Sequence, residues 1–413
     1  MTSKPALSAA ADSDLPVLQL RRNEDRRLRA GHSWIFSNEV DTNATPLTAF
    51  RAGQVARVMT DRAQFMGYAY VNPHALIAAR LMSRDQRQPV SAGLLRQRLA
   101  AALELRESLY HTPYYRWVFG ESDGLPGLIL DRFNDVVVGQ IATAGMQALQ
   151  IEVAAAVQGV AGIKALLWKN DGGARKLEEL ELEISVAFGE VPETIDVYEH
   201  PRGGDALHCV APLAAGQKTG WFFDQANNRA RLPRFLKPGG RVLDVCSYVG
   251  AWGVQAAMHG AGAVTCVDAS QSALDFVARN AALNKCDIQV VKGDAFDVLT
   301  NLADTGQRFD TVILDPPAFI KRKKELPQGQ AAYRKLNQLA LRVLDPGGVL
   351  VSCSCSYHLS QDDLQDAIQS AARHVDRFVQ ILEVGGQASD HPIHPAIAET
   401  RYLKALFCRV NRE

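Results

Sequence analysis

The sequence predicts an α/β protein whose C-terminal part is a doubly wound, Rossmann-like parallel sheet, preceded by a small N-terminal β-barrel and a central α+β domain. From residue 241 onward, apolar strands alternate with helical segments, as in parallel sheets with crossover helices. Short alternating stretches separated by turn residues occupy residues 53–81 and indicate a small β-rich module. A long helical pattern at residues 92–109 separates the two regions. We therefore expect domains at residues 15–90, 91–197 and 198–413.

Composition limits the function classes. The chain has 413 residues, 47% of them hydrophobic, and a formal net charge of zero, so contacts with nucleic acid must come from local basic patches. Seven cysteines without a Cys-x-x-Cys motif indicate reduced thiols in the cytoplasm and no zinc site. No apolar run is long enough for a membrane span, and residues 1–14 read as a loose tail rather than a signal peptide.

The N-terminal domain begins with a strand at residues 15–20, followed directly by a basic cluster. Arginine pairs with phosphate and stacks on bases, so this cluster is a candidate RNA contact. The alternative is a solvated helix whose neighbouring aromatic side chains enter a small core. The candidate residues are Arg21, Arg22, Arg26, Arg27 and the aromatic Trp34.

The central domain is expected to contain the helix at 92–109, a hairpin, a second helix at 151–160, and strands at 164–168 and 184–188. Its acidic residues Glu121, Asp123 and Asp131 resemble a catalytic carboxylate group. Because glycine and proline surround them, we expect surface turns instead.

Residues 241–270 predict a site for a ligand that contains adenosine. An apolar strand leads into a turn with Gly250, a helix, a second strand and Asp268, whose carboxylate can accept hydrogen bonds from ribose hydroxyls. The turn lacks the dinucleotide pattern G-x-G-x-x-G, and Tyr248 and Trp252 would crowd a pyrophosphate. The Asp244 carboxylate favours a cationic ligand. We therefore expect S-adenosylmethionine rather than a nicotinamide cofactor.

Three further strands end in chemically active residues: Asp294, then Asp315, then Cys353 and Cys355. If the last two strands are neighbours, Asp315 and Cys355 can reach one substrate atom. A thiolate that adds to carbon 6 of cytosine makes carbon 5 nucleophilic toward a methyl donor, and a carboxyl group stabilises the adduct near N3. Cys353 is expected in the core but stays a weaker candidate nucleophile, whereas Cys246 is expected to be structural.

The loop after Asp315 is a second candidate RNA contact. Phe319 offers a stacking face for an unpaired base. The basic run that follows is either a phosphate clamp at the pocket mouth or solvated surface. It comprises Lys321, Arg322, Lys323 and Lys324. His391 and His394 have no partner at metal-ligand spacing, so no metal site is expected.

Several motifs in order give the chain a family resemblance over nearly its whole length: GHSWIFSNEV, FGESDGLPGLILDRF, QKTGWFFDQANNR, DVCSYVGAWG, ILDPPAF, SCSCS and RYLKALFCRV. With these motifs the chain resembles the ribosomal large-subunit methyltransferase I family of bacterial 23S ribosomal RNA cytosine-C5 methyltransferases. The resemblance implies an RNA-binding PUA domain, a class I methyltransferase domain, S-adenosylmethionine as cofactor, 23S ribosomal RNA as partner and a homodimer.

The resemblance also implies residue roles. Cys355 matches the family's nucleophile and Asp315 its Asp-Pro-Pro acid. Ala318 stands where a different RNA cytosine-C5 family places a second cysteine, so the base that removes the C5 proton stays open, as does the choice between Cys355 and Cys353. The implied cofactor residues are Lys218, Thr219, Gly220, Phe223, Asp224, Gln225, Asp244, Ser247, Tyr248, Gly250, Asp268, Ala269, Asp294, Ala295 and Asp315.

Two alternatives remain at this stage. An enzyme that methylates an exocyclic base nitrogen needs the Asp-Pro-Pro-Ala-Phe loop at 315–319 but no nucleophilic thiol. An RNA-binding assembly factor with an idle methyltransferase domain needs neither.

Overall fold

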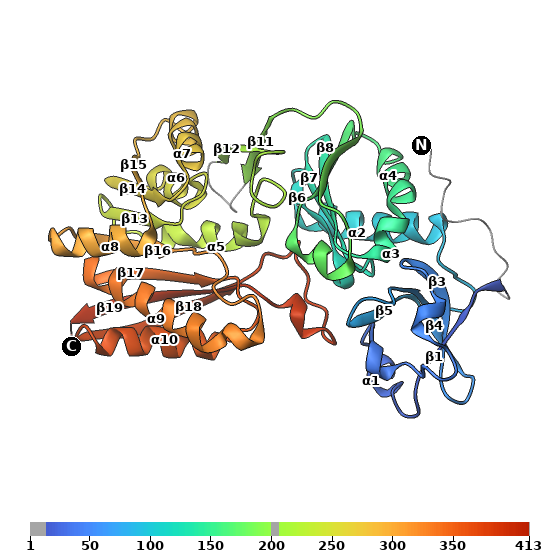
Figure 1. The fold of residues 1–413 in the computed structure, drawn as a ribbon. Helices are drawn as coiled ribbons and strands as arrows, with labels where there is room; N and C mark the ends of the chain where they lie inside the picture. The colour runs from blue at the N-terminus through green and yellow to red at the C-terminus, as the bar shows by residue number, and fades with distance from the viewer. Residues whose placement is uncertain (1–13, 200–205, 413) are drawn as a thin grey trace. The chain divides into compact units, whose positions relative to one another are not determined.

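The computed structural model describes residues 14–199 and 206–412, so most of the predicted N-terminal tail, at residues 1–13, lies outside the described residues. The chain divides into two compact units (Figure 1). Unit 1 comprises Met1–Glu193, Pro212–Trp221 and Asp390–Thr400, and unit 2 comprises Thr194–Ala211, Phe222–Ser389 and Arg401–Glu413. The three domain boundaries expected from the sequence stay predictions.

The N-terminal part of unit 1 is the small β-module that alternating apolar residues predict. Its sheet has the order β1-β3-β4-β5-β2. An antiparallel bridge between Leu20 and Val40, just beyond the two edge strands, brings the ends of the sheet together. The alternate residues form a core that includes Leu18, Ile35 and Val58. The elements are β1 Val17–Gln19, α1 Arg26–Arg29, β2 Trp34–Phe36, β3 Gln54–Met59, β4 Phe65–Val71 and β5 Ile77–Ser83.

The central part of unit 1 is a five-stranded sheet of order β10-β9-β8-β7-β6 with helices packed on it. Helix α2 begins after Ser91, whose side chain accepts a hydrogen bond from the Leu94 amide, and buries Leu95 and Leu99 beside Trp117. The predicted helices and strands are present here. The elements are α2 Ala92–Leu109, β6 Tyr114–Phe119, β7 Leu128–Phe133, β8 Val136–Ile141, α3 Ala144–Ala148, α4 Gln150–Gln158, β9 Ala165–Asn170 and β10 Glu183–Phe188.

The expectation of surface turns at the acidic residues is wrong for Asp131. It lies inside β7, is fully buried, and accepts two hydrogen bonds from the buried Arg116 at 2.7 and 2.8 Å. Asp123 does lie in a short 3-10 turn, but its side chain is also buried and pairs with Arg106 at 2.6 and 2.8 Å. Both carboxylates are structural because each is paired with a buried guanidinium group.

Unit 2 contains the predicted doubly wound sheet, whose order is β15-β14-β13-β16-β17-β19-β18, and β11 pairs with β12 in a separate two-stranded sheet. Strands β13 to β17 run parallel, and β19 is antiparallel to both of its neighbours. The elements are β11 Thr194–Glu199, β12 Leu207–Pro212, α5 Ala226–Arg231, β13 Arg241–Val245, α6 Ala251–Met258, β14 Ala263–Asp268, α7 Gln271–Leu283, β15 Gln289–Lys292, α8 Ala295–Asp304, β16 Phe309–Leu314, α9 Leu326–Val343, β17 Leu344–Ser354, α10 Gln361–Arg373, β18 Arg377–Gly386 and β19 Lys404–Arg412.

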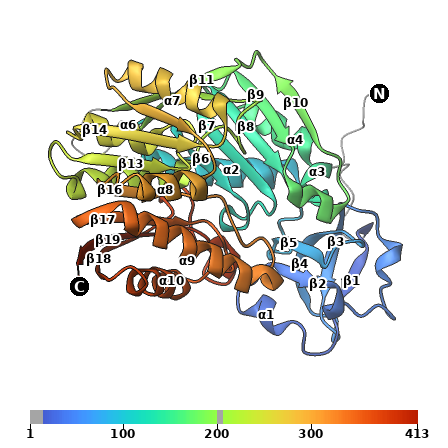
Figure 2. The ribbon, with the colours of Figure 1, turned by 60° about the vertical axis from the view of Figure 1, so that its left-hand side comes forward.

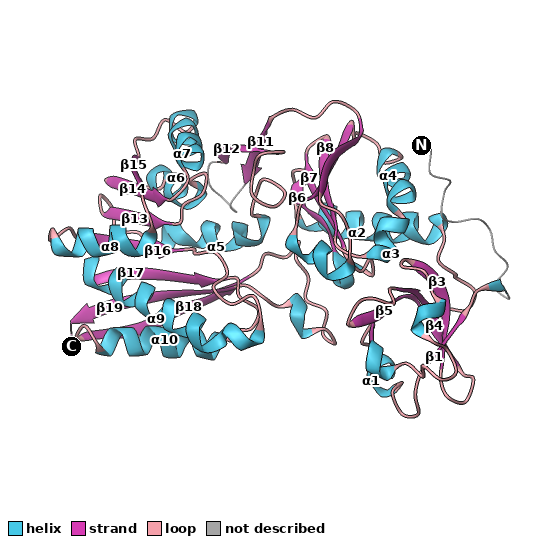
Figure 3. Ribbon diagram, viewed as in Figure 1, coloured by secondary structure: helices cyan, strands magenta, loops and turns pink. Residues whose placement is uncertain are grey.

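Two layers of helices cover this sheet (Figure 3). Helix α6 contacts α5 and α7, and helix α9 contacts α8 and α10. Figure 2 shows α8 and α9 beside β16 and β17. The sheet between the layers is nearly continuous apolar sequence, as expected for strands buried on both faces.

Strands β16 and β17 are direct neighbours, as the sequence predicts. Leu314 is paired with Ser352 in parallel register. The residues that follow the two strands therefore emerge at the same rim of the sheet, where ligands of open α/β folds bind.

Candidate functional site

The turn after β13 is wound tightly. Cys246 and Tyr248 have φ angles of 64° and 50°, and Gly250 has a φ of 85°. A left-handed conformation costs a non-glycine residue of the order of 1–3 kcal/mol, and such residues concentrate at functional sites. A Cβ on Gly250 would also lie 3.0 Å from the Val277 side chain, so glycine is required there.

Asp244 ends β13 as a buried carboxylate that the protein only partly satisfies. Its Oδ2 accepts a hydrogen bond from the Gly253 amide at 3.0 Å, while Oδ1 has no hydrogen-bond partner among the described residues. Burial, together with the nearby Asp315 carboxylate, raises the pKa of Asp244 to about 7. A cationic ligand would compensate both carboxylates. The expected cofactor, which carries an ammonium and a sulfonium, fits this group.

Asp268 connects two turns at the end of β14. Its carboxylate accepts hydrogen bonds from the amides of Tyr248 and Ser270, each at 2.9 Å. Each oxygen keeps a second lone pair for a ribose hydroxyl. The adjacent Ala269 is exposed, and Ser247 is buried beneath the turn. Asp268 therefore holds the turn in shape and remains able to bind a sugar.

Asp294, predicted at the end of the third strand, is exposed and caps helix α8. Its Oδ1 accepts a hydrogen bond from the Phe296 amide at 2.8 Å. Ala295 is the first residue of that helix and is half-buried. The acid and the helix start lie one strand further along the sheet from Asp268.

The predicted cofactor segment at residues 218–225 is divided between the two units. Lys218, Thr219 and Gly220 belong to unit 1, where the Thr219 hydroxyl is buried and donates to Asp131. The other three residues belong to unit 2. These are Phe223, which is buried; Asp224, whose Oδ2 accepts the Tyr402 hydroxyl at 2.5 Å; and Gln225.

Asp315 sits at the rim in a small polar network. Its Oδ1 accepts a hydrogen bond from Gln225 Nε2 at 2.9 Å and its Oδ2 accepts one from Trp252 Nε1 at 3.1 Å. Asn228 Nδ2 in turn donates to Gln225 Oε1 at 2.7 Å, which orients the amide. Burial raises the pKa of Asp315 to about 6, with a further increase from Asp224, although the Trp252 and Gln225 donors act in the opposite direction.

The two candidate thiols differ in environment. Cys355 is half-buried after the end of β17, and its Sγ lies 4.0 Å from the Pro316 carbonyl oxygen, beside the Asp-Pro-Pro loop. Cys353 is fully buried inside the strand, and burial raises the pKa of its thiol well above the usual value. A thiol held protonated is a poor nucleophile. The geometry therefore favours Cys355.

The residues on both sides of Cys355 are clamped. Ser354 Oγ donates to the Tyr333 hydroxyl at 2.9 Å, and the Ser356 Oγ lies 3.0 Å from the same hydroxyl. Ser356 Oγ also accepts the Ile320 amide at 3.2 Å. Because Tyr333 comes from α9 and Ile320 from the loop after Asp315, the Ser-Cys-Ser sequence is fixed from two directions.

Lys404 is a functional candidate that sequence reasoning missed. Its buried ammonium donates to the carbonyl oxygens of Ser356 at 2.6 Å and Tyr402 at 2.8 Å. Burial lowers the pKa of Lys404 to about 8, while Cys355 and then Asp363 act to raise it. The signal in the sequence was a lysine directly before the apolar run ALFC of the strand KALFCRV.

The basic cluster near α1 is mostly exposed. Arg21, Arg22 and Arg26 are exposed, whereas Arg27 pairs with Glu39 at 2.7 Å and covers the Phe36 ring at 4.8 Å. Helix α1 spans only four residues. The candidate contact surface therefore consists chiefly of the other three arginines. Trp34 is separate from it, because its Nε1 donates to Glu121 at 2.9 Å.

The residues of the second predicted RNA contact differ in exposure. Phe319 packs between Phe296 and Tyr333, with ring centroids 6.1 and 4.8 Å away, and is half-buried. Lys321 to Lys324 are exposed, although Arg322 forms an ion pair with Glu325 at 2.5 Å. The lysines of this run are positioned to meet solvent or phosphate.

Within residues 14–199 and 206–412, no group of three or more His, Cys, Asp or Glu side chains could hold a metal ion. In the same residues, no helix has the length and apolar character needed to cross a membrane.

Comparison with known proteins agrees with this architecture. A PUA-like domain model matches residues 18–84, and the model of conserved hypothetical protein 95 matches residues 223–352. The ribosomal RNA large subunit methyltransferase I of Klebsiella pneumoniae (strain 342) is 34% identical over 97% of this chain and 99% of its own length. That of Cronobacter sakazakii is 32% identical over 95% and 99%.

The chain belongs to the ribosomal RNA large subunit methyltransferase I family. Membership confirms the predicted fold, with its PUA-like domain, and the expectation of a methyltransferase that uses S-adenosylmethionine.

Solved structures share the fold at lower identity. A provisionally assigned methyltransferase complexed with SAH has a TM-score of 0.80 and 21% identity over 96% of this chain and all of the other. A provisionally assigned SAM-dependent methyltransferase from Streptococcus mutans has a TM-score of 0.79 at the same identity and coverage. Both structures therefore share the fold of this chain.

Proposed function

We propose that this chain methylates carbon 5 of a cytosine in 23S ribosomal RNA through a covalent adduct between Cys355 and carbon 6. One observation carries the proposal: the neighbouring strands β16 and β17 end at one rim with Asp315 and Cys355, and the Cys355 thiol lies beside the Pro316 carbonyl. A nitrogen methyltransferase has no need of that thiol. The relatives' name supplies the RNA class.

The proposed reaction begins with the Cys355 thiolate. It adds to carbon 6, and the electron pair of the 5,6 double bond becomes available at carbon 5. When bound, S-adenosylmethionine supplies the methyl group that carbon 5 takes up. Loss of the carbon 5 proton to a base then restores the double bond as the bond between carbon 6 and sulfur breaks, which returns the thiolate.

Asp315 is suited to the N3 edge of the cytosine. Since its pKa is raised to about 6, roughly a tenth of the carboxyl carries a proton at pH 7, far more than at the usual pKa of an aspartate. A protonated carboxyl donates to N3 while negative charge builds up in the ring during thiolate addition. Trp252 and Gln225 hold the carboxyl in one orientation for this purpose.

The cofactor would be held by Asp244, by the turn at 246–250 and by Asp268. The unpartnered Asp244 Oδ1 and the left-handed turn support this assignment. Lys404 would favour the thiolate form of Cys355, because a buried ammonium next to the Ser356 carbonyl places positive charge close to the nucleophile.

The test compares two cysteine variants two residues apart. Cys355→Ala should lower the methylation rate by at least about 10³-fold, whereas Cys353→Ala should keep it within about threefold. Nucleoside mass spectrometry of ribosomal RNA identifies the product as 5-methylcytosine. RNA that contains 5-fluorocytidine should form a denaturant-stable adduct with the wild type, since fluorine cannot leave as a proton.

Other outcomes would favour the alternatives. Full activity in Cys355→Ala with methyl on an exocyclic nitrogen would replace the carbon 5 mechanism. Absence of S-adenosylmethionine binding in calorimetry would favour a non-catalytic assembly factor.

Two further expectations belong to this proposal. A cytoplasmic location is supported by seven cysteines, none of which forms a disulfide in the described residues. A homodimer is expected from the family resemblance, and light scattering coupled to size-exclusion chromatography measures it directly.

A further inference from the structure

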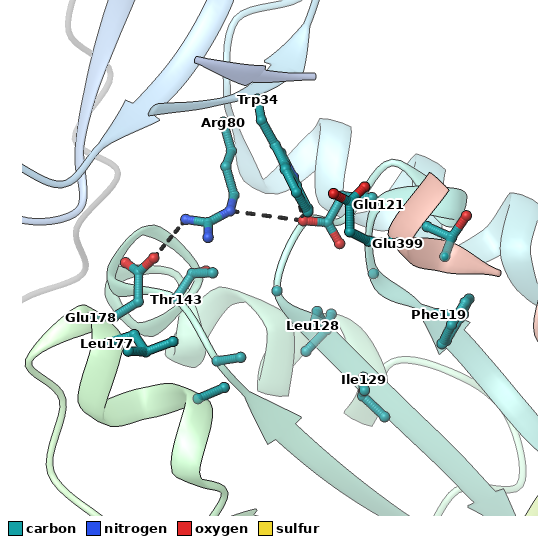
Figure 4. Close-up of a pocket in the computed structure, with 15 residues that line it drawn as sticks. Trp34, Arg80, Phe119, Glu121, Leu128, Ile129, Thr143, Leu177, Glu178 and Glu399 are labelled. Carbon is teal, nitrogen blue, oxygen red and sulfur yellow. Dashed lines mark hydrogen bonds and ion pairs between the residues drawn. The ribbon is translucent and has the colours of Figure 1, made fainter. Parts of the chain in front are cut away.

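Unit 1 contains a pocket that the methyl-transfer chemistry does not use. It has a volume of about 280 Å³, close to the lower end for small-ligand sites. In Figure 4, Trp34 and Arg80 enter from the barrel on the side opposite Leu128 and Ile129 of β7. The polar and aromatic lining consists of Trp34, Arg80, Phe119, Glu121, Thr143, Glu178, Glu399 and Thr400.

One wall of the pocket is a buried ion pair between Arg80 and Glu178. Arg80 Nη1 donates to Glu178 Oε1 at 2.7 Å, and Glu178 Oε2 accepts Asn72 Nδ2 at 2.7 Å and the Ala144 amide at 3.2 Å. Arg80 Nε has no hydrogen-bond partner among the described residues and lies 3.8 Å from Glu121 Oε1. A phosphate that approached this guanidinium group would therefore meet the carboxylates of Glu121 and Glu178.

The opposite wall keeps acceptor capacity. Glu121 Oε1 accepts Trp34 Nε1 at 2.9 Å and lies 3.8 Å from Arg80 Nε. Glu399 is exposed at the rim, and Figure 4 shows the two carboxylates close together beside the Trp34 ring. With three carboxylates and one guanidinium in its lining, the pocket repels phosphate and favours groups that present N–H donors.

The remaining lining is flat and apolar. Leu128 and Ile129 project from β7, and the Trp34 and Phe119 rings are half-buried. Aromatic faces next to fixed acceptors are what unpaired bases use in sequence-specific RNA recognition. The charge and the apolar faces together describe a site for a nucleobase without its phosphate.

We propose that this pocket binds one unpaired guanine of the RNA substrate, at a distance in sequence from the methylated cytosine. Guanine presents N1–H and N2–H side by side, and a carboxylate can accept both, as it accepts an arginine fork. Adenine and uracil place an acceptor beside each such donor, which would oppose the carboxylate. The proposal rests on RNA being the substrate, as proposed above.

The test measures base preference with the full chain at one fixed salt concentration, because RNA affinity depends strongly on salt. The probes are fluorescent uridine hexamers that carry a single central guanosine, inosine or adenosine. The wild type should bind the guanosine probe about tenfold more tightly than the adenosine probe, with the inosine probe between them because inosine lacks the N2 amino group.

Glu121→Gln should abolish that preference and leave the affinity for the adenosine probe within about twofold. Glu104→Gln, which changes an exposed glutamate on α2 outside the pocket lining, is the matched control and should keep the preference. Trp34→Leu should weaken binding of the guanosine and inosine probes alike, since stacking is lost. Circular dichroism and melting temperature establish that each variant is folded.

Two results would overturn the proposal: equal affinity of the wild type for the guanosine and adenosine probes, or binding of methylguanidinium in the pocket without any base preference in RNA. Failure of the proposed function is distinguishable. Cys355→Ala should keep the guanosine preference, so loss of the carbon 5 mechanism with retention of the preference would leave the pocket as an RNA site.

Discussion

The rim of the seven-stranded sheet and the pocket of unit 1 are built around the same contact, an indole N–H that donates to a carboxylate. Trp252 donates to Asp315 at 3.1 Å, and Trp34 donates to Glu121 at 2.9 Å. They differ in the second partner. Asp315 receives a neutral amide from Gln225, whereas Glu121 faces the guanidinium of Arg80.

This difference suits Asp315 to proton transfer and Glu121 to the binding of a ligand. Neutral donors do not offset the burial of Asp315, so its pKa is raised to about 6 and the carboxyl can exchange a proton near neutral pH. Glu121, by contrast, offers carboxylate oxygens that accept hydrogen bonds, with the Arg80 guanidinium 3.8 Å away. The same local motif can therefore serve a reacting base in one place and select a base in the other.

The largest expected effect is on the methylation rate and comes from replacing the rim carboxyl group of Asp315. Asp315→Asn keeps the side-chain shape and removes the exchangeable proton, and its single carbonyl oxygen can accept from Trp252 or from Gln225 but not from both. We expect the single-turnover methylation rate to fall by about 10²–10³-fold. Glu121→Gln, the corresponding change in the pocket, should leave the rate at saturating RNA within about threefold. Equal losses in the two variants would contradict the division of roles.

The next effect concerns stability and removes the cation from the pocket. Arg80→Met leaves the Glu178 carboxylate buried without its guanidinium partner, so the free energy of unfolding should fall by roughly 3 kcal/mol. Arg87→Met removes a surface ion pair with Asp85 and is the control, with no measurable change in the free energy of unfolding expected. Urea denaturation measures the free energy of unfolding of both variants. Similar decreases in the two variants would show that the buried pair of Arg80 and Glu178 does not stabilise the protein more than the surface pair does.

A third prediction uses pH to test the buried acid next to Asp315. The folded-state pKa of Asp244 is raised to about 7 from its usual value near 3.8, so its contribution to stability is present below pH 4 and is lost as pH rises toward 7. Asp244→Asn removes this loss. Without bound cofactor, the free energy of unfolding of the variant should rise by roughly 2–4 kcal/mol relative to that of the wild type as the pH increases from 4.5 to 8.

The control for this series is Asp287→Asn, which changes an exposed carboxylate and should show a difference that does not vary with pH. Urea unfolding at each pH gives the two curves. If the Asp244→Asn curve were equally flat, the carboxylate would not be held in the neutral form by burial.

Much of the rim was predictable from the sequence. The alternation of side chains within a strand and the residue that follows each strand can be read from neighbouring positions in the chain. Because β16 and β17 are adjacent, Asp315 and Cys355 follow neighbouring strands, and Cys353 inside β17 is buried in the core. That the two residues act on one substrate atom stays a prediction. What pattern reasoning missed were contacts made over long sequence separations. Asp131 was expected in a surface turn because its neighbours are turn formers, but Arg116 from the adjacent strand stabilises it inside β7.

The pocket was missed for the same reason. Trp34, Glu121 and Glu399 are far apart in the chain, so no spacing in the sequence indicates that their side chains meet. Lys404 lies 49 positions after Cys355 in number, and only the pairing of β19 with β17, which sets Lys404 opposite Ser354, brings it to the nucleophile's strand. The position of a β19 side chain relative to β17 cannot be predicted without the register in which these two antiparallel strands pair.

The smallest expected effect sharpens the comparison, because Lys404 places a buried ammonium beside the Ser356 carbonyl at the rim. Lys404→Met keeps the length of the side chain and removes the ammonium that donates to Ser356. We expect the methylation rate at pH 7 to fall by about tenfold and the apparent thiol pKa of Cys355 to rise by about one unit. The thiol pKa is measured from iodoacetamide alkylation rates, with Cys355→Ala identifying the signal of this cysteine.

The pH dependence distinguishes an electrostatic role from a merely structural one. Because the pKa of Lys404 is lowered to about 8, the wild-type ammonium loses its charge as pH rises past that value, and the advantage of the wild type over Lys404→Met should shrink toward pH 9. A constant tenfold deficit from pH 6.5 to pH 9 would mean that Lys404 acts only by holding the Ser356 carbonyl. In that case the charge that activates the thiol would have to come from another group.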